Sequence, residues 1–123
     1  MTYDDGPNDP YTFRLLEVLA EHEVRATFFY DWSLRSPAPR DRSRRSPAAG
    51  HLISNHTMTH PLLLVRPSGI VRQQLRDCNA ALEDVLDAPV RWFCPLHGGR
   101  RPDVLRAVRD LGLTPVTWEC DGV

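Results

Sequence analysis

The chain contains no lysine and no long apolar run. All 15 basic residues are arginines and 16 residues are acidic, so the net charge at pH 7 is −1. This near balance argues against a basic face for nucleic acid, and we expect no nucleic-acid partner. The longest apolar run covers residues 62–65. A membrane helix needs roughly 20 such residues, so we expect no membrane span.

Cysteine is scarce, and its spacing excludes two kinds of site. Cys78, Cys94 and Cys120 are odd in number and far apart, which suits neither a disulfide framework nor a Cys-x-x-Cys zinc site. The length of 123 residues corresponds to one domain at roughly 100–200 residues each, so residues 1–123 are read as a single domain. The sequence leaves open both the oligomeric state and the compartment, cytoplasmic or exported.

The remaining residues alternate between two periodicities. Helical patterns are predicted from Asp9-Pro10 to about residue 23, from Ser68 as the cap to a stop at Pro89, and from Pro102 to a stop at Gly112. The second helix is expected to bury Ile70, Val71, Leu75, Cys78, Leu82, Val85 and Leu86. Strands are predicted at the start of the chain and at residues 25–30, 51–55, 90–94 and 114–118.

This alternation of strand and helix predicts an α/β fold with a parallel sheet. One segment interrupts it, because residues 32–49 hold three prolines among several arginines. Proline breaks a continuous helix, so the composition there favours an irregular solvated loop. A basic arm for an anionic partner is the alternative.

Two polar motifs follow predicted strands. Asp4 and Asp5 end the first strand just before a Gly-Pro turn, and His56 and His60 follow the third. The carboxyl ends of parallel strands are where α/β folds place their sites. Two histidines and one aspartate would supply three ligands to a metal such as zinc and leave a position for water. The other aspartate could then accept the proton of that water.

Two further motifs follow the later strands. Pro95 and His97 come after the fourth strand, directly before Gly98-Gly99, and Trp118 and Asp121 stand at the end of the last strand. Glycine permits a close approach of the backbone to a ligand. Trp118 could wall a substrate pocket and Asp121 could orient a partner.

Together the motifs resemble one family. Residues 2–7 (Thr-Tyr-Asp-Asp-Gly-Pro) and 55–61 (Asn-His-Thr-Met-Thr-His-Pro), in this order, are similar to the polysaccharide deacetylase family with its NodB homology domain. The resemblance implies a distorted (β/α) barrel, here partial and incomplete at both termini. It also implies metal-dependent removal of acetyl groups from N- or O-acetylated carbohydrate.

The resemblance also assigns roles to residues. Asp4 becomes the general base, and Asp5, His56 and His60 become ligands of a divalent metal, zinc first, with cobalt, nickel and manganese as alternatives. A backbone N–H near His97 would contact the oxyanion, and Asp121 would orient a partner residue. Pro95 and Trp118 would contact the acetylated carbohydrate.

The sequence departs from the family pattern at a third motif, where Cys94 holds the position of an arginine that pairs with the base. Asp4 would thereby lose that cationic partner, and we do not expect Arg100 or Arg101 to replace it. The family's late Leu-x-x-His stretch, which supplies a general acid, is also missing.

These departures favour an alternative, a degenerate domain that binds metal or glycan without turnover. Two histidines and a carboxylate also form the facial triad of non-haem iron oxygenases, which is a third hypothesis.

Overall fold

The computed structural model describes residues 1–6, 10–30, 50–96 and 100–117. The strands in these ranges are β1 (Thr2–Gly6), β2 (Thr27–Tyr30), β3 (Leu52–Asn55), β4 (Trp92–Phe93) and β5 (Thr114–Pro115). The helices are α1 (Tyr11–Glu21), α3 (Ser68–Leu86) and α4 (Pro102–Asp110), with a 3₁₀ turn, η1 (Leu63–Val65). None of these helices is long and apolar enough to cross a membrane. The segment predicted to be irregular, residues 32–49, lies outside the described residues.

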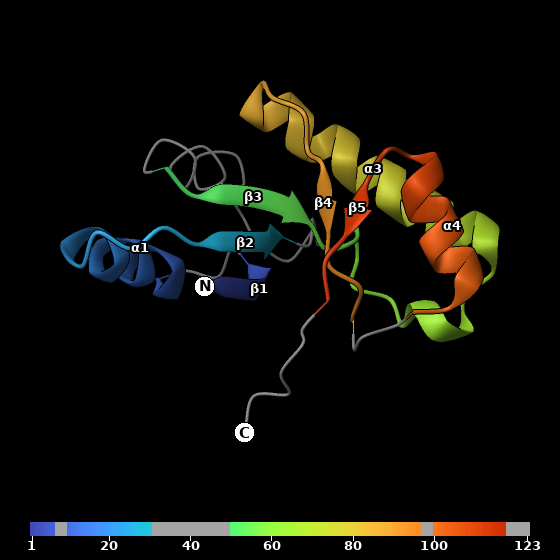
Figure 1. Cartoon of the computed structure of the whole chain (residues 1–123), viewed down its shortest axis with the longest axis horizontal. Coiled ribbons are helices and arrows are strands. Elements are labelled where there is room, and N and C mark those ends of the chain that lie inside the picture. The colour runs from blue at the N-terminus through green and yellow to red at the C-terminus, as the bar shows by residue number, and fades with distance from the viewer. Residues whose placement is uncertain (7–9, 31–49, 97–99, 118–123) are drawn as a thin grey trace.

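All five strands form one parallel sheet in the order β1-β2-β3-β4-β5, which confirms the predicted α/β class (Figure 1). Thr2, Thr27 and Leu52 stand in register across the first three strands. Because the strands are parallel, their carboxyl ends meet at a single edge of the sheet. The residues that follow β3 and β4 are therefore brought to the same edge as the end of β1.

One face of the sheet is covered by the helices. Figure 1 shows α3 and α4 beside β4 and β5, with α1 near β1 and β2. Two apolar clusters lie beneath them, and α3 contributes to both: Cys78 and Leu82 pack toward β2 and β3, while Val71 and Leu75 pack toward β4 and α4. This single helix therefore joins the two halves of the core.

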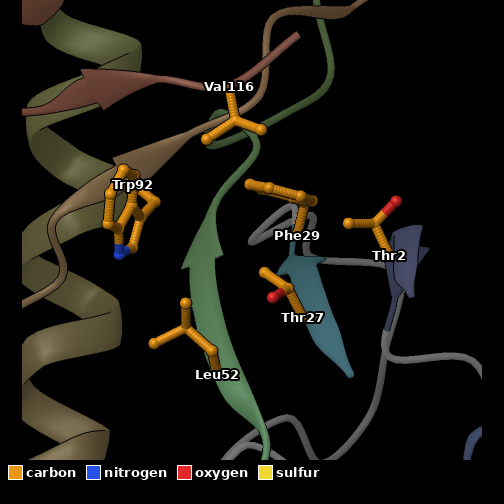
Figure 2. Close-up of a pocket in the computed structure, with 6 residues that line it drawn as sticks. All are labelled: Thr2, Thr27, Phe29, Leu52, Trp92 and Val116. Atoms are coloured by element: carbon orange, nitrogen blue, oxygen red, sulfur yellow. The ribbon is translucent and has the colours of Figure 1, made fainter. Parts of the chain in front are cut away.

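The other face, called here the inner face, is concave. Thr2, Thr27, Phe29, Leu52, Trp92 and Val116 line a hollow of about 240 Å³ on it (Figure 2). Its curvature is visible in one contact, since Asp4 Oδ2 on β1 lies 4.0 Å from the sulfur of Cys94, the residue after β4. Three strand spacings in a flat sheet would separate these strands by about 14 Å. The sheet curls as a portion of a barrel does.

The ends of the elements follow their predicted signals unevenly. Gly112 ends α4 as predicted: it has a φ of 72°, and the N–H groups of Gly112 and Leu113 donate to the carbonyls of Arg109 and Val108. The prediction that Ser68 caps α3 was wrong, because Pro67 holds that position and the Ser68 hydroxyl donates to Asp103 on α4 instead. Ile70, expected on the buried face, is 42% exposed.

Candidate functional site

The candidate site lies at the carboxyl edge of the sheet, where three strands end. Asp4 belongs to β1, His56 directly follows β3 and Cys94 directly follows β4. The backbone N–H of Cys94 donates to the carbonyl of Asn55 at 3.1 Å, which continues the pairing of β3 and β4 by one step. The sheet thus brings together residues that are about 90 positions apart in the sequence.

The pairing of β1 with β2 contains an irregularity at Asp5. Asp4 pairs with Phe29 and Gly6 pairs with Tyr30, so Asp5 is an extra residue in the strand. In a regular strand, successive side chains point to opposite faces, and a bulge interrupts that alternation. The side chain of Asp5 lies outside the described part of the structure.

His56 is buried, and its hydrogen bond identifies the protonated ring nitrogen. Its Nδ1 atom lies 2.8 Å from the carbonyl oxygen of Cys94. Since a carbonyl only accepts, Nδ1 is the donor in this hydrogen bond. This leaves Nε2 as the ring nitrogen of His56 that could bind a metal.

His60 is brought beside His56 by a tight turn. The two ring centroids lie 5.3 Å apart with their planes at 62°. Thr57 and His60 both adopt left-handed backbone conformations, with φ values of 78° and 53°. Such conformations cost about 1–2 kcal/mol per residue, so the turn must be held by other contacts.

Those contacts come from Asn55, which sequence reasoning missed. Its Oδ1 accepts the N–H of Thr57 at 2.9 Å, and its Nδ2 donates to the Leu75 carbonyl at 2.8 Å and to Asn79 Oδ1 at 3.1 Å. Asn55 therefore anchors the histidine turn to α3. The only sequence signal was a polar residue ending a buried strand, which does not reveal its partners.

The separation of the two histidine rings agrees with that of two imidazole ligands of one zinc ion. Zinc binds an imidazole nitrogen at about 2.0–2.1 Å, so two rings at a tetrahedral angle have centroids about 5 Å apart, close to the observed separation. Among the described side chains there is no group of three His, Cys, Asp or Glu that could hold a metal. The third ligand expected from the sequence, Asp5, has its side chain outside that set, so its role stays a prediction.

Asp4 contacts a thiol at the place where the resemblance led us to expect an arginine. Cys94 is 1% exposed, and its Sγ lies 4.0 Å from Asp4 Oδ2. Arg101 does not take the place of that arginine. It donates to Asp103 and to the carbonyls of Leu64 and Arg66. These bonds tie the segment after the histidines to α4.

The carboxyl of Asp103 is correspondingly engaged. The hydrogen bonds from Arg101 and then from Ser68 hold the pKa of Asp103 well below its usual range.

Pro95, an expected substrate contact, is fully buried next to Cys94. The remaining predicted site residues, His97, Trp118 and Asp121, lie outside the described residues.

Known proteins are similar to this chain in sequence. Residues 1–116 match the polysaccharide deacetylase family, and the chain belongs to that family. A chitooligosaccharide deacetylase of Rhizobium leguminosarum bv. trifolii is 39% identical over 121 residues, covering 98% of this chain and 56% of the relative. The chain thus spans little more than half the length of that relative.

Solved structures agree with the fold. A family 4 carbohydrate esterase from Streptomyces lividans, in complex with acetate, has 25% identity and a TM-score of 0.89, covering 96% of this chain and 60% of that one. A pseudoenzyme of the same esterase family from Bacillus anthracis has 29% identity and a TM-score of 0.86, covering 95% and 41%. The predicted NodB-type α/β fold, present in part, is therefore confirmed.

Proposed function

We propose that this chain carries the site of a metal-dependent hydrolase that removes acetyl groups from N- or O-acetylated carbohydrate. The observation that carries this proposal is the pairing of His56 and His60 at the carboxyl edge, with Asp4 linked to them through Cys94. The chitooligosaccharide deacetylase relative supports an acetylated sugar as the substrate class.

In this proposal His56, His60 and Asp5 hold a divalent metal. Zinc is the first choice, because two imidazoles and a carboxylate are ordinary zinc ligands and leave a position open. When bound, the ion polarises the acetyl carbonyl and lowers the pKa of water. The hydrogen bond from His56 Nδ1 to the Cys94 carbonyl fixes the orientation of that ring.

Asp4 acts as the general base that accepts the proton of the attacking water. Its place on a bulged strand beside the metal ligand Asp5 supports this division of roles. A backbone N–H near His97 contributes to the oxyanion contact, Asp121 orients a partner residue, and Trp118 contacts the sugar. Pro95 is fully buried, so we do not assign it a contact with the sugar.

A non-catalytic metal- or glycan-binding domain is the second candidate. The observation that favours it is Cys94, because a neutral thiol contacts Asp4 where the family pattern has a cation. The similar protein from Bacillus anthracis is a pseudoenzyme of the same esterase family.

Two measurements on the purified chain separate these candidates. The first is zinc content, for which we expect about one ion per chain, lost in His56→Ala and kept in His22→Ala, whose histidine is exposed at the end of α1. The second is acetate release from a chitooligosaccharide. Asp4→Asn should lower turnover about 10²–10⁴-fold, whereas Asp84→Asn, an exposed change on α3, should not.

The outcomes differ clearly. Zinc binding with acetate release that depends on Asp4 supports the hydrolase. Zinc or glycan binding without acetate release favours the binding domain. A chain that binds no zinc under any loading condition refutes the metal-dependent proposal.

A further inference from the structure

One residue, Cys94, touches both halves of the candidate site. Its carbonyl accepts the Nδ1 proton of His56 at 2.8 Å, and its thiol donates to Asp4 Oδ2 at 4.0 Å. Its own N–H is bound to the carbonyl of Asn55, and the side chain is 1% exposed. The backbone of Cys94 is therefore fixed by the sheet, and its sulfur can reach Asp4 from a defined position.

We propose that Cys94 is a positioning residue, whose thiol donates a hydrogen bond that holds the Asp4 carboxylate in place during acetyl removal. The proposal rests on the proposed function. The two contacts of Cys94 differ in kind. The carbonyl contact to His56 persists with any side chain at position 94, whereas the contact to Asp4 depends on the sulfur. Substitution at this position therefore changes the placement of Asp4 and leaves the orientation of His56 intact.

The strength of this positioning is limited by the chemistry of sulfur. A thiol is a weak donor, and the Cys94 sulfur also has the Pro95 carbonyl at 3.9 Å as a second acceptor. A hydrogen bond to a charged group contributes more than one to a neutral group, but a shared thiol lies at the weak end. We therefore expect its loss to lower kcat about 3- to 10-fold.

The first test compares kcat and KM for Cys94→Ala and Cys94→Ser on a chitooligosaccharide. The alanine variant should lose kcat at unchanged KM and unchanged zinc content, and serine, which keeps a donor, should restore part of the loss. The matched control is Cys78→Ala, because Cys78 is equally buried but its thiol faces the Tyr30 carbonyl at 3.7 Å in the helix-covered core. Measured at a temperature where it is folded, that variant should keep kcat.

The second test needs no activity. Asp4→Ala, Cys94→Ala and the double variant form a cycle, read as the unfolding equilibrium constant of the metal-free chain in urea. Residues in contact show coupling. We expect the effect of Cys94→Ala to differ about threefold between the chains with and without Asp4.

Coupling in the cycle, together with the kcat order of wild type, serine and alanine, supports the role of Cys94. Absence of coupling, or wild-type kcat in Cys94→Ala, overturns it. If the wild-type chain releases no acetate at all, the proposed function fails, and the cycle alone decides whether Cys94 positions Asp4.

Discussion

The histidine turn is anchored by Asn55, and replacing this residue by alanine should lower both the stability of the chain and the zinc affinity proposed for His56 and His60. The change leaves the Thr57 N–H, buried and formerly bound at 2.9 Å, with no side-chain acceptor from residue 55. An unsatisfied buried donor costs about 1–3 kcal/mol. The two bonds from Nδ2 to Leu75 and Asn79 add about 0.5–1.5 kcal/mol each, but the Leu75 carbonyl keeps its place in α3. With the Leu75 bond discounted for this reason, we expect a total loss of about 1.5–4.5 kcal/mol.

The assay is urea unfolding of the metal-free chain, followed by zinc titration under conditions where the variant is folded. Gln74→Ala is the matched control, because Gln74 anchors the same turn through the Thr59 N–H at 2.9 Å but does so at an exposed position. It should cost less than about 1 kcal/mol, since exposed hydrogen bonds exchange readily with water. The reasoning is refuted if Asn55→Ala costs no more than Gln74→Ala, or if its zinc affinity equals that of the wild type.

Three further predictions concern stability away from the turn that carries His56 and His60. Gly112→Ala should lower stability by about 1–2 kcal/mol because Gly112 has a left-handed φ, whereas Gly69→Ala in α3 should raise stability by up to about 1 kcal/mol. Neither added Cβ meets an atom within 4 Å, so the difference comes from the backbone alone. Equal effects of the two changes in urea unfolding would contradict this argument. Burial lowers the pKa of His51, whose Nδ1 accepts the Ala26 N–H. As the pH falls, His51 is therefore protonated in the unfolded chain before it is protonated in the folded chain. The wild type should lose stability relative to His51→Gln below pH 6.5, by at most about 1.4 kcal/mol per pH unit. Parallel stability profiles of the two proteins against pH would exclude this role of His51. Ser54 has a buried hydroxyl with no hydrogen-bond partner in the described part of the chain, so Ser54→Ala should be neutral or stabilising by up to about 1 kcal/mol in thermal unfolding.

The fold class was predictable because it rests on periodicity. Apolar residues at helical spacing identified most of the buried face of α3, although Ile70 at its start is exposed. Gly112 marked the end of α4 because a left-handed residue there is very commonly glycine. The errors lie where a distant element intervenes. The Ser68 hydroxyl binds Asp103, which is 35 positions away, and no local pattern reports such a partner.

The candidate site was predictable in its residue types but not in its support. The spacing of His56 and His60 was sufficient to pair them, since three intervening residues can return the chain to the same point. The left-handed conformation of Thr57 was not foreseeable, because threonine disfavours it and the hydrogen bond from its N–H to Asn55 Oδ1 is not visible in the sequence. The contact between Asp4 and Cys94 depends on the curvature of the whole sheet, which is a property of the packed structure rather than of either motif.

Helix α3 connects the candidate site to the core of the fold. Its buried side chains join the two apolar clusters, while its Leu75 carbonyl and the side chains of Asn79 and Gln74 hold the histidine turn. The strain at Thr57 and His60 is offset in part by bonds within the turn, from the Thr57 N–H to Asn55 Oδ1 and from the His60 N–H to Thr57 Oγ1. The rest of the support comes from α3, through the Leu75 carbonyl and the side chains of Asn79 and Gln74. Zinc bound by His56 and His60 would in turn stabilise the packed state of α3 by mass action, so metal loading and folding are expected to be coupled in this chain.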